Sequence, residues 1–104
     1  EIMKRHPDVD GIFSGNDLMA IGALKGLRAL GIEVPKQVSV CGFDGIGLSE
    51  IIEPELTTVA QPIYEMGELA ATILIDKIEG KVKEHLIYDL DVSLIERSST
   101  KRRI

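Results

Sequence analysis

The sequence has one cysteine, no tryptophan, and aromatic side chains at only 4% of its 104 residues. The single thiol, Cys41, has no partner for a disulfide within the chain, and its place in an apolar run predicts a small core residue. No apolar stretch approaches the roughly 18 residues that a membrane-spanning helix needs, so no membrane role is expected. The composition is that of an ordinary globular protein of at most one domain.

A signal peptide and an initiating methionine are also missing from the start of the sequence. Residues 1–6 are typical of the end of a helix, and Pro7 stops that helix. We therefore expect Glu1 to be an internal cut in a longer protein, which means that the missing signal peptide says nothing about the parent protein.

Positive charge is scarce, because the formal net charge is -5. An acidic chain has no electrostatic attraction for a phosphate backbone, so these residues are not expected to bind nucleic acid themselves. The one basic cluster, residues 101–103, is expected to be a solvated tail.

Motifs for catalysis, cofactors and metals are missing as well. His6 and His85 have no cysteine or carboxylate cluster beside them in the sequence, and no known nucleophile or phosphate-loop motif is present. Residues 45–47 match only the start of a dinucleotide-binding fingerprint, since Glu50 stands where a glycine or alanine is needed. We predict no catalytic residue, no metal and no cofactor.

What the sequence does contain is a regular alternation of strand and helix patterns. The expected strands cover 9–14, 38–43 and 56–60, and the expected helices cover about 16–30, 46–52 and 62–79. Residues 86–94 alternate apolar and polar side chains, which predicts one more strand or two strands joined by a bend. This order predicts an α/β fold with a mostly parallel sheet and flanking helices. The nearly all-apolar strand 38–43 is expected to be covered on both faces.

The two longer helices each have an apolar face. Gly31 is expected to end the first helix. The predicted core stripe of this helix contains Ala20, Ala23, Leu24, Leu27 and Leu30. Leu18 and Ile21 lie off that stripe and give the helix a second apolar face. The predicted core face of the helix over 62–79 contains Ile63, Met66, Ala70, Ile73, Leu74 and Ile78.

Polar side chains follow the predicted parallel strands, where ligands of open α/β sheets are bound. Asn16 follows the first strand and Asp44 follows the second. A carboxylate accepts hydroxyl hydrogen bonds, and an amide both donates and accepts them. Each residue has an equally good structural explanation as a helix cap. Gln61, after the third strand, is a weaker candidate.

Five segments together are similar to the LacI/GalR family of bacterial transcription regulators. They are residues 13–24, 31–44, 56–62, the Met66-Gly67 pair with Ala70, and 94–99. Each segment alone is weak, but their common order and spacing over about residues 5–100 are specific.

This resemblance implies the C-terminal fragment of a periplasmic-binding-protein-like domain, in which two lobes enclose a small effector, often a sugar or nucleobase. Residues 1–61 would form units of the second lobe, 62–80 a helix of the first-lobe type, and 81–100 the terminal strand region. The family usually carries an N-terminal helix-turn-helix, absent here, that binds operator DNA as a dimer in the cytoplasm. The alternative is an extracytoplasmic sugar-binding protein of the same fold, serving transport or chemotaxis.

The resemblance also assigns residues. Asn16 and Asp44 would lie in the effector cleft, and Gln61 near a crossing between lobes. Gly45 departs from the acidic or polar residue that is frequent at its position in the family. The homodimer face would contain Leu18, Ile21, Leu48, Ile51 and Ile52, with the alternative that these residues belong to the core. With half a cleft, the chain alone is expected to bind effector weakly, and to associate with copies of itself through its exposed apolar faces.

Overall fold

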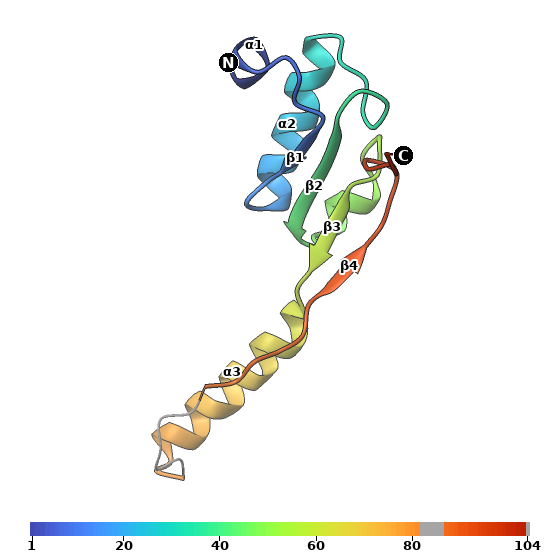
Figure 1. Cartoon of the computed structure of the whole chain (residues 1–104). Coiled ribbons are helices and arrows are strands. Elements are labelled where there is room, and N and C mark those ends of the chain that lie inside the picture. The colour runs from blue at the N-terminus through green and yellow to red at the C-terminus, as the bar shows by residue number, and fades with distance from the viewer. Residues whose placement is uncertain (82–86, 104) are drawn as a thin grey trace.

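A four-stranded sheet forms the centre of the molecule (Figure 1). The structure is a computed structural model, and it describes residues 1–81 and 87–103. Strands β1 (Gly11–Phe13), β2 (Ser39–Asp44) and β3 (Thr57–Ala60) are parallel, and β4 (Ser93–Ile95) is antiparallel to β3. The prediction of an α/β fold with a mostly parallel sheet is confirmed.

Helix α2 (Asp17–Ala29) packs on one face of this sheet. The Asn16 side chain caps its start, and Gly31, at φ +72°, follows its end as predicted. The core joins α2 to β2 and to the residue before β3, and its buried members are Ala20, Leu24, Leu27, Val38, Val40 and Leu56. Leu30 was predicted to share this core but is exposed, because it lies beyond the last helical residue, where the chain turns.

The opposite face of the sheet is only partly covered. Val40 and Gly42 point toward α2 and are buried, whereas Cys41 and Phe43 on the other face are half-buried. Phe13, on the neighbouring strand, is 68% exposed. The prediction that residues 38–43 are covered on both faces is therefore wrong for the described part of the chain, where α2 covers one face.

The C-terminal segment after β4 is anchored against β2 and β3. The Ser99 backbone N–H donates to the Glu55 carbonyl, and the Val40 N–H donates to the Ser99 carbonyl, both at 2.9 Å. The Ser99 hydroxyl also donates to the Val40 carbonyl at 2.6 Å. Arg103, predicted to lie in a solvated tail, is exposed but donates to the Gln37 carbonyl at 2.7 Å.

Two short helices complete this unit. Helix α1 (Ile2–Arg5) ends before Pro7, as the sequence predicted. The second, η1 (Gly47–Glu50), is a 3-10 helix and is shorter than the predicted helix over 46–52. None of the described helices is both long and apolar enough to cross a membrane.

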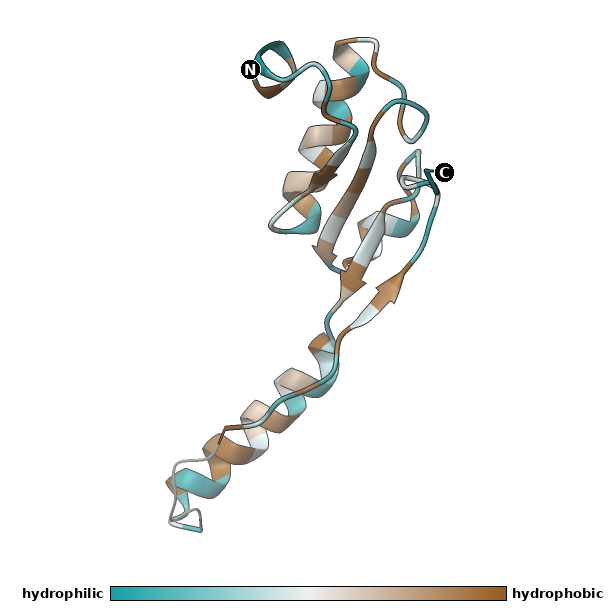
Figure 2. Ribbon diagram, in the orientation of Figure 1, coloured by the Kyte–Doolittle hydropathy of each residue, from teal (hydrophilic) through white to brown (hydrophobic). Residues whose placement is uncertain are grey.

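Helix α3 (Ile63–Ile78) extends away from the sheet, and residues 87–92 run back beside it (Figure 1). This arm gives the molecule extents of 58 × 27 × 27 Å. No residue of α3 is buried, and Leu74 is 59% exposed. The predicted core face of this helix is not buried within the described residues, where only the segment 87–92 accompanies it, although its members Met66, Ala70 and Ile73 line a groove shared with that segment. Hydrophobic residues are spread along α3 (Figure 2).

The predicted strand over 86–94 is reduced to β4. Residues 87–92 have no strand pairing, and Leu86 lies outside the described residues. Tyr88, Leu90 and Val92 instead line a groove shared with α3. The alternating pattern therefore marks one apolar side of this segment, but a strand also requires a neighbouring backbone to pair with.

Candidate functional site

Asp44 and Gln61 lie together at the carboxyl end of the parallel strands. The Gln61 amide Nε2 donates to Asp44 Oδ1 at 2.6 Å, and the Gln61 backbone N–H donates to the Asp44 carbonyl at 3.0 Å. Both side chains are half-buried. The two candidates that followed different strands in the sequence are thus brought into direct contact by the parallel pairing of β2 with β3.

The backbone of Asp44 is unusual. Its φ of 131° makes it the only non-glycine residue with positive φ in the described ranges 1–81 and 87–103. Such a conformation costs of order 1–3 kcal/mol and is retained where the surrounding contacts impose it, often at ligand sites. The 3-10 helix η1 has no side-chain cap, so the alternative explanation of Asp44 as its cap is wrong.

Asn16 has a demonstrated structural role. Its Oδ1 accepts a hydrogen bond from the Met19 backbone N–H at 2.8 Å, which confirms the helix-cap interpretation. The side chain is half-buried after β1, the strand that neighbours β2. Because the Asn16 amide oxygen is used for capping, its NH2 group remains available to donate a hydrogen bond. The ligand-binding role of Asn16 stays a prediction.

Sequence reasoning missed the central residue of this region, Asp17, which it treated only as favourable for the start of a helix. Its side chain is fully buried. Oδ2 accepts hydrogen bonds from the Gly45 N–H (3.0 Å), the Ile46 N–H (2.9 Å) and the Ser49 hydroxyl (2.7 Å). Oδ1 accepts from the Thr58 hydroxyl at 2.6 Å. These partners are 28 to 41 residues away, so no local pattern could have identified them.

These hydrogen bonds keep the Asp17 carboxylate ionised. Burial by itself raises the pKa, but the hydroxyl donors Ser49 and Thr58 and the two backbone N–H groups outweigh it and hold the pKa of Asp17 below its ordinary value of 3.8. Burial, together with the charge of Asp17, raises the pKa of the Cys41 thiol. The N–H groups of Gly45 and Ile46 are therefore occupied by a carboxylate, which is a further argument against a bound pyrophosphate.

Two glycines make room for this network. A Cβ on Gly42 would collide with the Asp17 carboxylate, and a Cβ on Gly45 would lie 2.7 Å from the Ala60 Cβ. Gly45 also has φ +82°, which favours glycine. At the position of Gly45 the family often has an acidic or polar residue. A glycine fits this chain because the turn packs tightly against β3.

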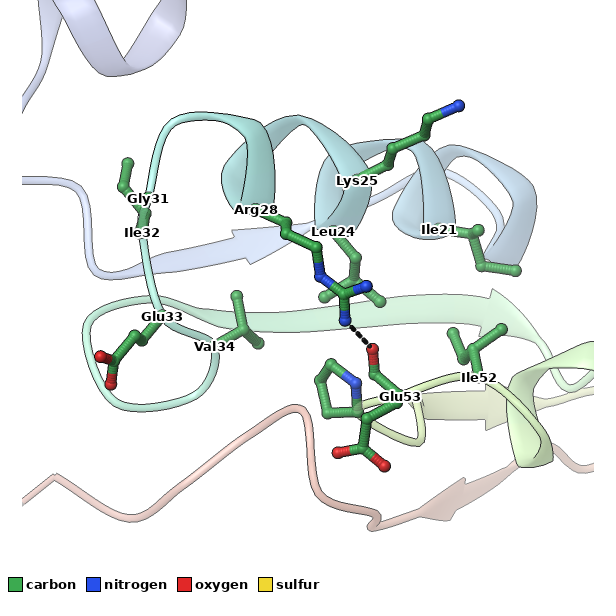
Figure 3. Close-up of a pocket in the computed structure, with 11 residues that line it drawn as sticks. Ile21, Leu24, Lys25, Arg28, Gly31, Ile32, Glu33, Val34, Ile52 and Glu53 are labelled. Carbon is green, nitrogen blue, oxygen red and sulfur yellow. Dashed lines mark hydrogen bonds between the residues drawn. The ribbon is translucent and has the colours of Figure 1, made fainter.

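The predicted dimer-face residues divide into two groups. Leu18, Leu48 and Ile51 are exposed, the last of them 77%. Ile21 and Ile52 are half-buried against the core. Both of these line a cavity of about 680 Å³ between α2 and the loop at 52–54, where the Arg28 guanidinium donates to the Glu53 carbonyl at 2.9 Å (Figure 3). This cavity does not include Asn16, Asp44 or Gln61.

Across residues 1–81 and 87–103, no group of three or more His, Cys, Asp or Glu side chains is arranged to hold a metal ion. His85 lies outside these ranges.

Comparison with known families and curated proteins gives a consistent result. Residues 1–100 match the family model described as a periplasmic binding protein-like domain. The chain is 39% identical over 100 residues to the ribose operon repressor of Halalkalibacterium halodurans, covering 96% of this chain and 30% of that protein. It is 46% identical over 100 residues to the transcriptional regulator RegA of Clostridium acetobutylicum, again over 96% and 30%. The chain thus spans about a third of the length of these relatives.

Solved structures agree. The transcriptional regulator CelR in complex with cellobiose has a TM-score of 0.90 at 41% identity, with 94% of this chain and 30% of that chain covered. A LacI family regulator from Enterococcus faecium with bound ribose has a TM-score of 0.86 at 39% identity, with 95% and 38% covered.

Proposed function

The chain belongs to the family of periplasmic binding protein-like domains, in the branch of LacI-type transcription regulators, and we propose that it supplies part of a sugar-sensing site and of a dimer face in such a regulator. The observation that carries this proposal is the contact between Asp44 and Gln61 at the carboxyl end of the sheet. The domain match and the sugar-bound relatives support a sugar as the ligand class.

The chemistry of the site suits a polyol. The Asp44 carboxylate accepts hydrogen bonds only, so it matches the hydroxyl donors of a sugar. Gln61 donates to one of its oxygens and thereby fixes the orientation of the carboxylate, which lowers the cost of ordering it on binding. Asn16 would add a donor from the neighbouring strand end. A sugar would then be recognised by Asn16, Asp44 and Gln61 together with residues from the rest of the protein.

The division of the chain supports a two-lobe protein. Residues 1–61 would belong to the second lobe, and 62–80 would be a helix that packs in the first lobe, since α3 projects from the sheet with no buried residue. Residues 81–100 would form the terminal strand region. Effector binding would change the closure of the lobes, and this can regulate DNA binding only if the two states bind effector differently.

The partners follow from the same reasoning. Two copies would associate through Leu18, Leu48 and Ile51, which are exposed, with Ile21 and Ile52 behind them. Operator DNA would be bound by another part of the protein in the cytoplasm, since the net charge of this chain is -5. The regulators among the relatives favour this function over an extracytoplasmic sugar-binding protein and over an enzyme.

The test is sugar binding by the full-length protein. Cellobiose, lactose and ribose are titrated by calorimetry into the wild type and into Asp44→Ala, with Asp8→Ala as the control because Asp8 is exposed at a distance from the site in sequence. Loss of a charged acceptor should weaken binding by about 10- to 100-fold. Equal affinities in Asp44→Ala and wild type would contradict the assignment of the site.

A further inference from the structure

The sequence contains two Asp-Gly pairs, Asp10–Gly11 and Asp44–Gly45. Such a pair is chemically reactive, because glycine has no side chain to hinder its nitrogen from attacking the carboxyl group of the preceding aspartate. Asp10 and Gly11 are exposed where β1 begins, whereas Asp44 and Gly45 are half-buried where β2 ends. The same reactive sequence therefore lies in two different surroundings.

The reaction of an Asp-Gly pair consumes no oxidant or cofactor. The glycine nitrogen forms a bond to the aspartate Cγ, and the carboxyl hydroxyl leaves as water with the amide hydrogen, which closes a succinimide ring. Water then opens the ring. Cleavage between the nitrogen and Cγ restores aspartate. Cleavage between the nitrogen and the backbone carbonyl carbon gives isoaspartate, in which the main chain runs through Cγ and the former backbone carbonyl is a carboxylate.

The turn after β2 requires its glycine. A Cβ on Gly45 would lie 2.7 Å from the Ala60 Cβ, and the φ of +82° favours glycine as well. A bulkier residue that would slow the reaction does not fit at this position. The candidate ligand residue Asp44 is therefore followed by the residue type that makes it most reactive.

Both reacting groups of this second pair are held by other partners. The Gly45 N–H donates to Asp17 Oδ2 at 3.0 Å, and Gln61 Nε2 donates to Asp44 Oδ1 at 2.6 Å. The Gly45 nitrogen attacks only after it loses its proton, and the buried negative charge of Asp17 opposes that loss because like charges repel strongly in the interior. Asp10 instead makes a surface contact, with 3.7 Å between its Oδ2 and Arg103 Nε.

We propose that Asp44–Gly45 is a site of isoaspartate formation that the Asp17 carboxylate keeps unreactive in the folded protein. Conversion would add one main-chain carbon between β2 and the turn and would displace the Gly45 N–H from Asp17. The Asp44 carbonyl, which accepts from the Gln61 backbone N–H at 3.0 Å, would become a carboxylate. The lifetime of the candidate site then depends on Asp17, whether or not its ligand is a sugar.

The first test compares the folded and the unfolded wild type. The full-length protein is incubated at neutral pH with and without urea, and isoaspartate at Asp10 and Asp44 is followed by peptide mapping with fragmentation that distinguishes the two isomers. In urea both pairs should react at similar rates. In the folded protein the rate at Asp44 should be at least about ten-fold lower than in urea. Equal rates at Asp44 in both conditions, or no isoaspartate there in urea, would overturn the proposal.

A matched pair of variants then separates Asp17 from general stability. Asp17→Asn removes the charge at nearly constant shape, and Leu27→Ala destabilises the core through a side chain that is 3% exposed, without a bond to the turn. Under conditions where both variants are folded by circular dichroism, Asp17→Asn should raise the rate at Asp44 at least about ten-fold and leave Asp10 unchanged. Leu27→Ala should leave both rates unchanged. An equal rise at Asp44 in the two variants would show that isoaspartate forms only through global unfolding, and Asp17 would have no specific role.

Thr58→Val replaces Asp17→Asn if that variant does not fold. It removes the hydroxyl that donates to Asp17 Oδ1 at 2.6 Å, so the carboxylate is free to turn away from Gly45. The rate at Asp44 should then exceed that in Leu27→Ala by about three-fold, and equal rates would count against the proposal. No sugar enters these measurements, so their outcome is independent of the sugar-sensing function.

Discussion

Helices α2 and α3 have similar amphipathic sequences but opposite surroundings. Helix α2 buries Ala20, Leu24 and Leu27 against β2 and the start of β3. Helix α3 is the longer of the two and carries at least as many large apolar side chains, yet none of its residues is buried. An apolar stripe on a helix therefore indicates that the helix packs against another element. It does not say whether that element lies in the same stretch of chain.

The two regions also differ in how their polar groups are used. The sheet and helix α2, which together form the sheet unit, contain a hydrogen-bond network around the buried Asp17 carboxylate. Among the described residues, no buried side-chain nitrogen or oxygen lacks a hydrogen-bond partner. Among the described residues of the arm the side-chain interactions are local: the Thr72 hydroxyl donates to the Glu68 carbonyl within α3, and Lys81 pairs with Glu79 at 2.7 Å. Stability should therefore be concentrated in the sheet unit.

The largest expected effect is that of Asp17→Ala. This change leaves four donors, from Gly45, Ile46, Ser49 and Thr58, without their acceptor in the interior. We expect a loss of about 3–5 kcal/mol in the free energy of unfolding, measured by urea denaturation. Asp8→Ala, at an exposed carboxylate, should change it by less than about 0.5 kcal/mol. A loss in Asp17→Ala no larger than in this control would contradict the network.

The next effect compares the two helices directly. Leu27→Ala removes a side chain that is 3% exposed and should cost about 2–5 kcal/mol in the 104-residue chain. Leu74→Ala, in α3, should cost less than about 0.5 kcal/mol in the same experiment at a protein concentration at which the chain is monomeric, because the side chain is then already in contact with water. A large, concentration-dependent loss in Leu74→Ala would instead show that copies of the chain bury α3 against each other.

The smallest expected effect is the dependence of the free energy of unfolding on pH at low pH. Because the pKa of Asp17 is lower in the folded protein than the ordinary 3.8, the carboxylate stabilises the fold above that ordinary value. This contribution is lost as the pH falls through the folded-state pKa. Stability measured from pH 5 to pH 2 should therefore fall more steeply in the wild type than in Asp17→Asn, which has no proton to gain there. Parallel curves for the two proteins would contradict the lowered pKa of Asp17.

Local sequence signals succeeded where the interactions are themselves local. The cap at Asn16 acts on Met19, and Gly31 ends α2 at positive φ, so both are decided within a few residues. The alternation of strands and helices likewise predicted the parallel sheet. It also placed Asp44 and Gln61 after successive strands, which is why both appeared as candidates.

The order of the elements, the parallel sheet and the position of polar residues at its carboxyl end follow from local sequence patterns, because turns, caps and periodicity act between neighbouring residues. Tertiary structure alone decided that Asp17 is buried and that Gln61 donates to Asp44. It also decided that α3 lies open, because burial depends on which distant segments are present to cover a face. A carboxylate at a helix start looks the same in sequence whether it faces water or, as here, four donors from 28 to 41 residues away.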